Sequence, residues 1–267
     1  MSEHTSEIAN RFLDTNIPNT ARIFNYMLGG SANFEVDRQV AEQILQQMPS
    51  LRKWVRLRHA FVQEAAYRLG EEGFGQFLDF GSGIPAEDQI HTTVPNAKVI
   101  YSDINPVAVS YGQSLFANMD RVAFIFGDVR QIERILQSSE VKQLIDLQEK
   151  VAIGLNALML FLPPEDLKRI ARVLHDWAPK GSKLFVVFQT RQAGSSMAQY
   201  ENMLEISRMA GFPIRLYTLE EHIELLEPWS VDCLEPIAEF LGLPDDFITK
   251  ADEEGIGMQF FAAIMCK

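Results

Sequence analysis

Between residues 76 and 189 the chain alternates short apolar segments with helical ones, and this alternation constrains the fold more than any other feature. The apolar segments are 76–80, 97–103, 122–128, 150–156 and 182–189. Each is almost continuously apolar, which is typical of strands that helices cover on both faces. Strands alternating with helices build a parallel sheet with right-handed crossovers. We therefore predict an α/β fold with a doubly wound, mostly parallel sheet.

The helical segments predicted between these strands are 86–93, 106–118, 130–146 (as one or two helices) and 165–177. Two further strands, 230–237 and 257–267, end the chain as a hairpin-like pair, which brings the sheet to seven strands with an antiparallel last strand. Thr218 and Glu221 form a capping box at the start of one more helix. This ending differs from nicotinamide-binding folds, which usually continue with a second βαβαβ half.

The N-terminal part is helical and precedes the first strand. A helix that starts near residue 20 is broken at Gly29 and Gly30, because each glycine costs a helix roughly 1 kcal/mol. Further helices are predicted over 37–48 and 51–69 from their apolar spacing. We therefore divide the chain into a helical segment, 1–70, that covers the ligand site, and a ligand-binding domain, 71–267.

The stretch "QFLDFGSGIPAED", residues 76–88, reads as strand, glycine turn and helix. Gly81 and Gly83 let a ligand approach the backbone, and Pro85 suits the first position of a helix whose N-terminus favours negative charge. The letters fit the dinucleotide pattern G-x-G-x-x-G/A. They equally fit the D-x-G-x-G loop of S-adenosylmethionine (SAM) sites. NAD and SAM are therefore the two candidate cofactors.

Three carboxylates at successive strand ends separate the two cofactors. In doubly wound folds the ligand lies beyond the carboxyl ends of the strands. Asp79 would repel a pyrophosphate but pair with the ammonium of SAM, Asp103 would bind ribose hydroxyls in either case, and Asp128 would accept from the adenine amine. The alternatives are that Asp79 caps the glycine turn and that Asp128 is a helix N-cap. Together with the antiparallel ending, the three residues favour SAM.

Arg58 lies within the apolar stripe of the helix 51–69. Because an unpaired buried charge is prohibitive, its guanidinium must reach water, pair with a structural carboxylate or meet a ligand carboxylate.

Charge and composition restrict the partners. The net charge of −12 argues against nucleic acid and anionic membranes. Cys233 and Cys266 form no C-x-x-C pair and no Cys/His cluster has zinc spacing, so we expect no metal. Without an apolar signal core or a span of ~18 apolar residues, the expected location is the cytoplasm.

The chain resembles the class I SAM-dependent methyltransferases, and more narrowly a bacterial family of S-adenosyl methyltransferases. The resemblance rests on "RIFNYMLGGSANFEVD" (22–37), "FLDFGSGIP" (77–85), "VIYSDINP" (99–106) and "GDVR" (127–130). It implies a Rossmann-like methyltransferase sheet with an N-terminal helical cap. It also implies roles for residues: Gly81 and Gly83 line the methionyl part, Asp103 takes the ribose, Ile104 and Asn105 flank the adenine, Asp128 and Val129 contact its edge, Asn156 faces the methionyl or acceptor side, Arg58 meets the cofactor carboxylate, and Tyr26 and Gly30 contact the cofactor from the cap.

Two positions depart from the family pattern. Arg58 lies one position earlier than the arginine of "N-R-x-F", and Leu160 stands where members tend to carry the histidine of "L-H-F". His175 and His222 lie on predicted helices and are expected at the surface. The sequence therefore identifies no catalytic residue.

These features predict a SAM-dependent methyltransferase with a small-molecule acceptor. Methyl transfer is an in-line displacement that positioning accelerates, and it needs a base only if the acceptor loses a proton early. The alternatives are a SAM-binding protein of the same fold without methyl transfer and, less favoured, an NAD-dependent oxidoreductase. The acceptor and the oligomeric state do not follow from the sequence.

Overall fold

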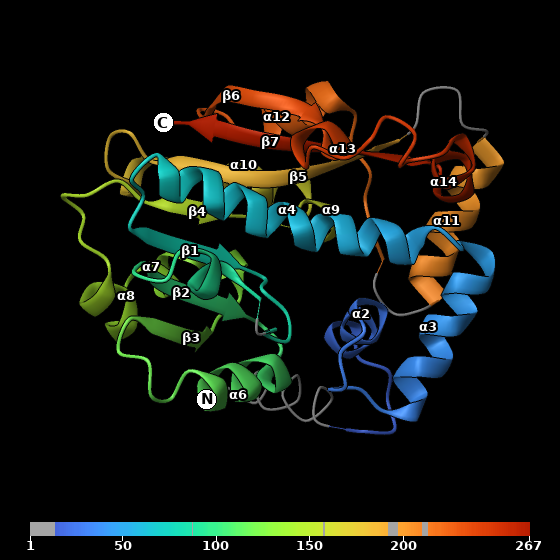
Figure 1. The fold of residues 1–267 in the computed structure, drawn as a ribbon, viewed down its shortest axis with the longest axis horizontal. Helices are drawn as coiled ribbons and strands as arrows, with labels where there is room; N and C mark the ends of the chain where they lie inside the picture. Colours follow the sequence, from blue (N-terminus) through green and yellow to red (C-terminus); the bar gives the residue numbers. More distant parts are fainter. Residues whose placement is uncertain (1–13, 87, 157, 192–196, 210–212) are drawn as a thin grey trace.

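A computed structural model describes residues 14–86, 88–156, 158–191, 197–209 and 213–267 (Figure 1). Its strands form one sheet in the order β3-β2-β1-β4-β5-β7-β6. They are β1 (Gln76–Phe80), β2 (Lys98–Asp103), β3 (Val122–Phe126), β4 (Ala152–Gly154), β5 (Lys183–Arg191), β6 (Ser230–Pro236) and β7 (Met258–Cys266). β1 to β5 run parallel, and β7 pairs antiparallel with both β5 and β6. The predicted seven-stranded, doubly wound sheet with an antiparallel last strand is confirmed.

Helices cover both faces of the sheet and create a hydrophobic core on each. On one face lie α4 (Leu51–Glu71), α5 (Ile90–Thr93), α6 (Pro106–Leu115) and α13 (Ile237–Phe240). On the other lie α7 (Ile132–Leu136), α8 (Ser139–Leu144), α10 (Pro164–Trp177) and α12 (Leu219–Leu225). Successive strand residues point to opposite faces, so Phe77 belongs to the first core and Leu78 to the second.

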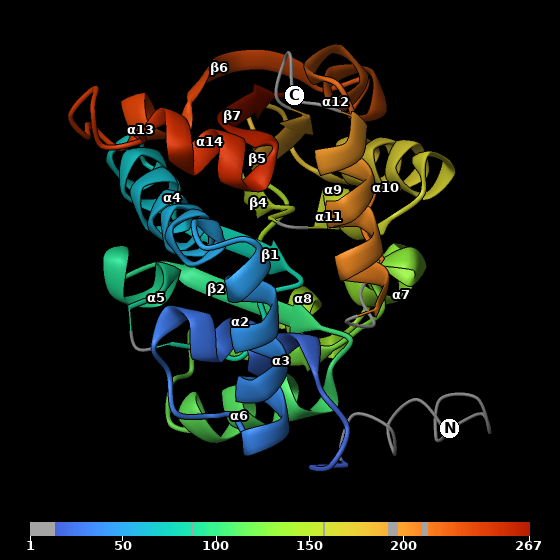
Figure 2. The ribbon, with the colours of Figure 1, turned by 90° about the vertical axis from the view of Figure 1, so that its right-hand side faces the viewer.

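The N-terminal cap consists of α2 (Thr20–Leu28) and α3 (Glu35–Gln47). Gly29 ends α2 with a left-handed φ of 92°, which glycine adopts at little cost, so the predicted break is confirmed. Figure 2 shows the cap in front of the carboxyl ends of the strands, between α4 and α6. α4, which belongs to the predicted segment 1–70, packs in the same core as the strands. The division of the chain at residue 70 stays a prediction.

Shorter elements complete the described chain: η1 (Val129–Gln131), α9 (Leu158–Phe161), α11 (Met197–Met209) and α14 (Lys250–Ile256). None of the described helices combines the length and apolarity needed to cross a membrane. In the same residues, no three His, Cys, Asp or Glu side chains are grouped so that they could hold a metal ion.

The prediction of a helix over 86–93 is wrong in its extent, because within the described residues of this range only Ile90–Thr93 is helical. The preceding described residues form a loop, in which Gly81 and Gly83 have left-handed φ values of 69° and 70°. Long-range contacts hold this loop: His59 Nε2 lies 3.2 Å from Asp88 Oδ1, and Gln63 on α4 donates to the Asp88 carbonyl. Pro85 therefore does not begin a helix, and the helix N-terminus predicted behind the glycines is wrong.

The surface position expected for His222 is also wrong. Its ring is buried and stacks on Phe188 with 4.6 Å between centroids. The Nε2 atom lies 3.1 Å from the Gln189 carbonyl, so it carries the proton and donates. Burial lowers the pKa of His222 to about 4, which keeps the ring neutral. His175 is partly exposed, with its edge against Trp229.

Candidate functional site

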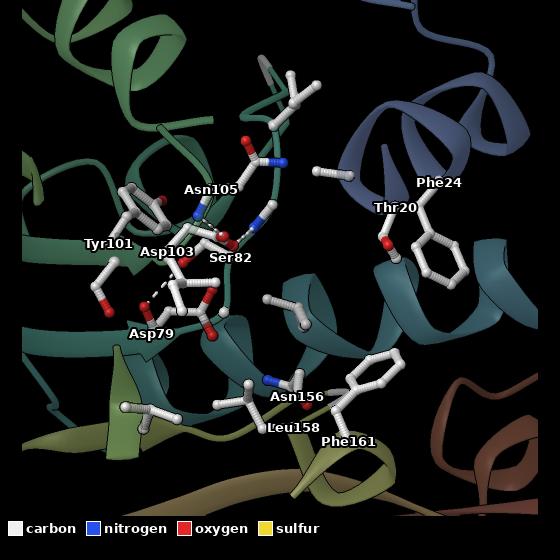
Figure 3. Close-up of a pocket in the computed structure, with 18 of the residues that line it drawn as sticks. Thr20, Phe24, Asp79, Ser82, Tyr101, Asp103, Asn105, Asn156, Leu158 and Phe161 are labelled. Carbon is white, nitrogen blue, oxygen red and sulfur yellow. Dashed lines mark hydrogen bonds between the residues drawn. The ribbon is translucent and has the colours of Figure 1, made fainter. Parts of the chain in front are cut away.

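A cavity of about 600 Å³ lies at the carboxyl ends of the parallel strands, between the sheet, α4 and the cap (Figure 3). Ten of the twelve residues predicted for the site line it: Arg58, Asp79, Gly81, Gly83, Asp103, Ile104, Asn105, Asp128, Val129 and Asn156. Asp79 and Asp103 lie at the carboxyl ends of β1 and β2, the segments that follow β1 to β4 supply the others, and Arg58 comes from α4.

Tyr26 and Gly30 are not among the lining residues. The Tyr26 hydroxyl donates to Glu42 Oε1 at 2.7 Å, and the Arg52 guanidinium lies over its ring. Gly30 packs so closely against Asn25, which does line the cavity, that an added Cβ would lie 2.3 Å from its Nδ2. Gly30 therefore contacts the cap, and Tyr26 contacts both the cap and α4, in this structure.

Asp79, the last residue but one of β1, is buried, 6% exposed, and its carboxylate Oδ1 has no hydrogen-bond partner. Its main-chain carbonyl accepts the Ser82 hydroxyl at 2.8 Å, which closes the glycine turn behind the carboxylate. Burial raises the pKa of Asp79 to about 7, and the neighbouring Asp103 carboxylate acts in the same direction. The Ser82 and Asn156 side chains act in the opposite direction on this pKa. A cationic ligand group would supply the partner that Asp79 Oδ1 lacks.

Asp103 ties the glycine loop to the end of β2. Its Oδ2 accepts the Gly83 N–H at 2.8 Å and its Oδ1 accepts the Asn105 N–H at 2.8 Å. Asn105 in turn caps α6 and donates from Nδ2 to Asn19 Oδ1 in the cap at 2.7 Å. Burial raises the pKa of Asp103. One carboxylate therefore fixes both the loop and the strand end that face the cavity.

Asp128, after β3, is the N-cap of η1: its Oδ1 accepts the Arg130 N–H at 2.9 Å. The same carboxylate receives the Arg130 guanidinium, with Nη2 2.7 Å from Oδ2. The N-cap interpretation is thus correct, and the Asp128 side chain remains 19% exposed beside the cavity. Its contact with adenine stays a prediction.

Arg58 extends from α4 into the cavity, with its guanidinium over the Phe24 ring at 5.1 Å from the centroid. Burial lowers the pKa of Arg58 to about 10, so the group remains charged at neutral pH. Within the described parts of the chain it forms no salt bridge. Of the three alternatives for Arg58, pairing with a structural carboxylate is therefore not observed in those parts.

Sequence reasoning missed the wall on the far side of Asn156. Both polar atoms of the Asn156 carboxamide are buried without a partner, and beyond it stand Leu158 and Phe161 of α9 and the exposed Arg215. Phe24 projects from α2 on the opposite side (Figure 3). The available signal was the apolar run "MLFLPP", which directly follows the fourth strand.

Comparisons with known proteins place the chain in a family. Residues 6–238 match the family model described as S-adenosyl methyltransferase. Two solved structures resemble nearly the whole chain. A candidate methyltransferase from Thermobifida fusca YX shares 27% identity, covers 96% of this chain and 97% of its own, and has a TM-score of 0.84. A DUF574 family protein from Streptomyces avermitilis MA-4680 shares 26% identity with coverages of 95% and 99% and a TM-score of 0.83.

A more distant similarity concerns the fold alone. The geranyl diphosphate C-methyltransferase from Streptomyces coelicolor A3(2), solved with Mg²⁺, geranyl diphosphate and S-adenosyl-L-homocysteine, is 11% identical with coverages of 99% and 98% and a TM-score of 0.53. Among curated proteins no match was found. With the family model matched from residue 6 to 238, the chain belongs to the S-adenosyl methyltransferase family, and its cofactor is S-adenosylmethionine.

Proposed function

We propose that the protein transfers a methyl group from S-adenosylmethionine to a small molecule. The observation that carries this proposal is a pair of charges facing one cavity. Asp79 Oδ1 has no hydrogen-bond partner, and Arg58 has no carboxylate partner among the described residues. The amino-acid end of SAM carries one ammonium and one carboxylate. It therefore complements both groups, whereas a pyrophosphate would be repelled by Asp79.

The lining residues divide the cofactor between them in this proposal. Asp79 takes the ammonium and Arg58 the carboxylate, while the glycine loop, through Gly81 and Gly83, lies along the methionyl chain. Each Asp103 oxygen keeps a lone pair beyond its backbone bond, which suits the ribose hydroxyls.

The remaining predicted residues complete the proposed assignment. Ile104 and Asn105 flank the adenine, Asp128 and Val129 lie at its edge, and Asn156 lies beside the methionyl chain and the acceptor. For Tyr26 and Gly30 we propose an indirect role, in which they maintain the cap through Glu42 and Asn25.

Methyl transfer depends more on the relative position of the methyl donor and the acceptor than on catalytic side chains of the protein. When bound, SAM would supply a sulfonium methyl group: a bond from the acceptor lone pair to the methyl carbon would form as the carbon–sulfur bond in line with it breaks, and the leaving group would be the thioether S-adenosylhomocysteine. The protein holds the methyl donor and the acceptor in line and excludes water. This positioning can supply much of the rate acceleration. A cavity of about 600 Å³ lies within the range of small-molecule sites, and the net charge of −12 disfavours a nucleic-acid acceptor.

Isothermal titration tests the cofactor site. We expect SAM and S-adenosylhomocysteine to bind and NAD not to bind. Asp79→Asn and Arg58→Met should each weaken S-adenosylhomocysteine roughly tenfold or more, because each removes a charged partner. Neither should change the affinity for methylthioadenosine, which lacks the amino and carboxyl groups. Arg56→Met, exposed on the same helix, is the matched control. Binding of NAD without binding of SAM would contradict the proposal.

A second function, cofactor binding without methyl transfer, is favoured by one observation. Leu160 is buried on α9. It stands where the family resemblance described above implies a histidine, so proton transfer by such a histidine has no counterpart at this position. Incubation of the protein with methyl-labelled SAM and a cell extract separates the two functions. A labelled small molecule supports transfer, whereas tight cofactor binding with no labelled product supports the second function.

A further inference from the structure

The part of the cavity beyond Asn156 has a different character from the cofactor-facing part. Phe161 and Leu158 of α9 form one side, and Phe24 and Leu28 of α2 form the other. Figure 3 shows Asn156 between Asp79 and Phe161, with the Phe24 ring across the cavity. An aromatic ring on the wall of a small-molecule site, here that of Phe161, favours a flat ligand, because offset ring stacking adds to burial of apolar area.

Asn156 is the polar group at the boundary between the two parts. Its carboxamide is 7% exposed, and neither Nδ2 nor Oδ1 has a hydrogen-bond partner. A buried carboxamide without partners is costly, and a ligand that donates and accepts, such as a hydroxyl group, would satisfy both atoms. Because Asn156 lies next to Asp79 at the carboxyl edge of the sheet, this group of the ligand would lie beside the cofactor.

Arg215 adds a positive charge at the outer side of the same wall. Its main-chain N–H donates to the Leu160 carbonyl at 2.7 Å, which fixes the backbone beside α9. Its guanidinium Nη1 donates to the Phe161 carbonyl at 3.3 Å. It has no carboxylate partner in the described residues, unlike Arg130, which is paired with Asp128. A guanidinium without a carboxylate partner can form charge-assisted hydrogen bonds with a carboxylate or a phosphate of a ligand.

We infer that the methyl acceptor is a flat, largely apolar molecule that carries one anionic group. Its ring packs against Phe161, its methyl-accepting group lies at Asn156, and its anion pairs with Arg215. This inference rests on the proposed function and names the substrate class for it. It excludes sugars, amino acids and other acceptors without a flat apolar body.

The test uses the full chain saturated with S-adenosylhomocysteine, and isothermal titration with four probes. These are 2-naphthoate, its uncharged analogue 2-naphthamide, the non-planar cyclohexanecarboxylate, and 2-naphthyl phosphate. We expect 2-naphthoate to bind roughly tenfold tighter than 2-naphthamide, which lacks the charge, and than cyclohexanecarboxylate, which lacks the flat ring. The phosphate then shows which anion Arg215 prefers.

Variants assign the effect to residues. Arg215→Gln should lower the affinity for 2-naphthoate roughly tenfold, to that of 2-naphthamide, and Arg215→Lys should restore part of it. Phe161→Leu keeps the wall apolar but removes the ring, and should weaken both naphthyl probes severalfold. Arg172→Gln, exposed on α10 and outside the cavity, is the control and should change nothing.

The outcomes distinguish this inference from the proposed function. If S-adenosylhomocysteine itself does not bind, the proposed function fails. If it binds and none of the naphthyl probes does, only the acceptor class is overturned. Equal binding of 2-naphthoate and 2-naphthamide, or an Arg215→Gln variant with unchanged affinity, overturns the anionic group. Equal binding of cyclohexanecarboxylate overturns the flat body.

Discussion

Arg22 and Asp37 form an ion pair that is almost completely buried in the N-terminal cap. The Nε–Oδ2 distance is 2.7 Å, and the two side chains are 1% and 0% exposed. Asp37 also accepts the N–H groups of Asn19 and Phe34, each at 2.9 Å. Arg22 and Asp37 are the first and last residues of the segment 22–37. Its two ends therefore join α2 to the start of α3 and fix the helix that carries Phe24 into the cavity.

Breaking this pair from one side should destabilise the protein strongly. Asp37→Asn removes the buried carboxylate that pairs with the Arg22 guanidinium and accepts two backbone N–H groups, and we expect the free energy of unfolding to fall by about 3–5 kcal/mol. Urea unfolding measures the change. The matched control is Arg38→Met, which breaks an exposed pair with Glu35 and should cost no more than about 1 kcal/mol. Similar losses in both variants would show that the buried pair does not hold the cap.

Cofactor affinity should depend on pH through Asp79. The pKa of Asp79 without ligand is about 7, and only the ionised carboxylate pairs with an ammonium. Below pH 7 a proton must leave before this pairing, so the affinity for S-adenosylhomocysteine should fall about tenfold between pH 8 and pH 6. Titrations across this range should show a flat profile for Asp79→Asn. A wild-type profile equally flat would remove Asp79 from the ammonium site.

The same residue should affect stability in the opposite sense without ligand. The folded pKa of about 7 lies above the ordinary value of 3.8, so between these values the folded protein keeps a proton that the unfolded chain has lost. The stability that Asp79 contributes is fully present below pH 4. It is lost as the pH rises to 7, and the free energy of unfolding falls by up to about 1.4 kcal/mol per pH unit. Urea unfolding between pH 5 and 8 measures the free energy of unfolding of wild type and Asp79→Asn. As the pH rises, the wild type should lose stability relative to the variant, because the asparagine of the variant cannot ionise. A constant difference contradicts it.

The sequence sufficed for the parallel sheet and for the strand ends because both depend on local patterns. Continuous apolar runs identify β1 to β5, and Asp79, Asp103 and Asp128 follow from their position at three strand ends. The helix predicted to follow Gly83 failed for a non-local reason. Asp88 is held by His59 and Gln63 of α4, so the loop keeps an irregular path that nearby letters do not encode.

The sequence predicted the site residues at the ends of the strands. It did not predict the residues that helices and loops outside the sheet bring to the cavity. Phe24, Phe161 and Arg215 meet in one cavity although they are far apart in sequence, and no periodicity relates them. The burial of His222 likewise depends on how α12 packs on β5. Tyr26 shows the reverse: it lies in a predicted segment, but its hydroxyl reaches Glu42 rather than the cavity.

Asp103 should matter for every adenosine ligand, in contrast to Asp79. Both of its oxygens accept backbone N–H groups, and Asp103→Asn turns an Nδ2 donor toward one of these donors. We expect the glycine loop to shift and S-adenosylhomocysteine and methylthioadenosine to weaken alike, by about tenfold or more. Parallel titrations of both ligands test this. A variant that loses only S-adenosylhomocysteine would place Asp103 at the amino-acid end instead.

Gly154, the last residue of β4, should be intolerant of a single methyl group because it faces Asp79. A Cβ at this position would lie 2.4 Å from Asp79 Oδ1 and 2.7 Å from Phe185 Cζ, so both side chains must move. We expect Gly154→Ala to cost about 1–3 kcal/mol of unfolding free energy through overpacking. It should also weaken S-adenosylhomocysteine at least as much as Asp79→Asn, with methylthioadenosine little affected. Gly75→Ala, where a Cβ meets no atom within 4 Å, is the control for the extra methyl group. Wild-type affinity in a folded Gly154→Ala protein would mean that the position of the Asp79 carboxylate does not determine cofactor binding.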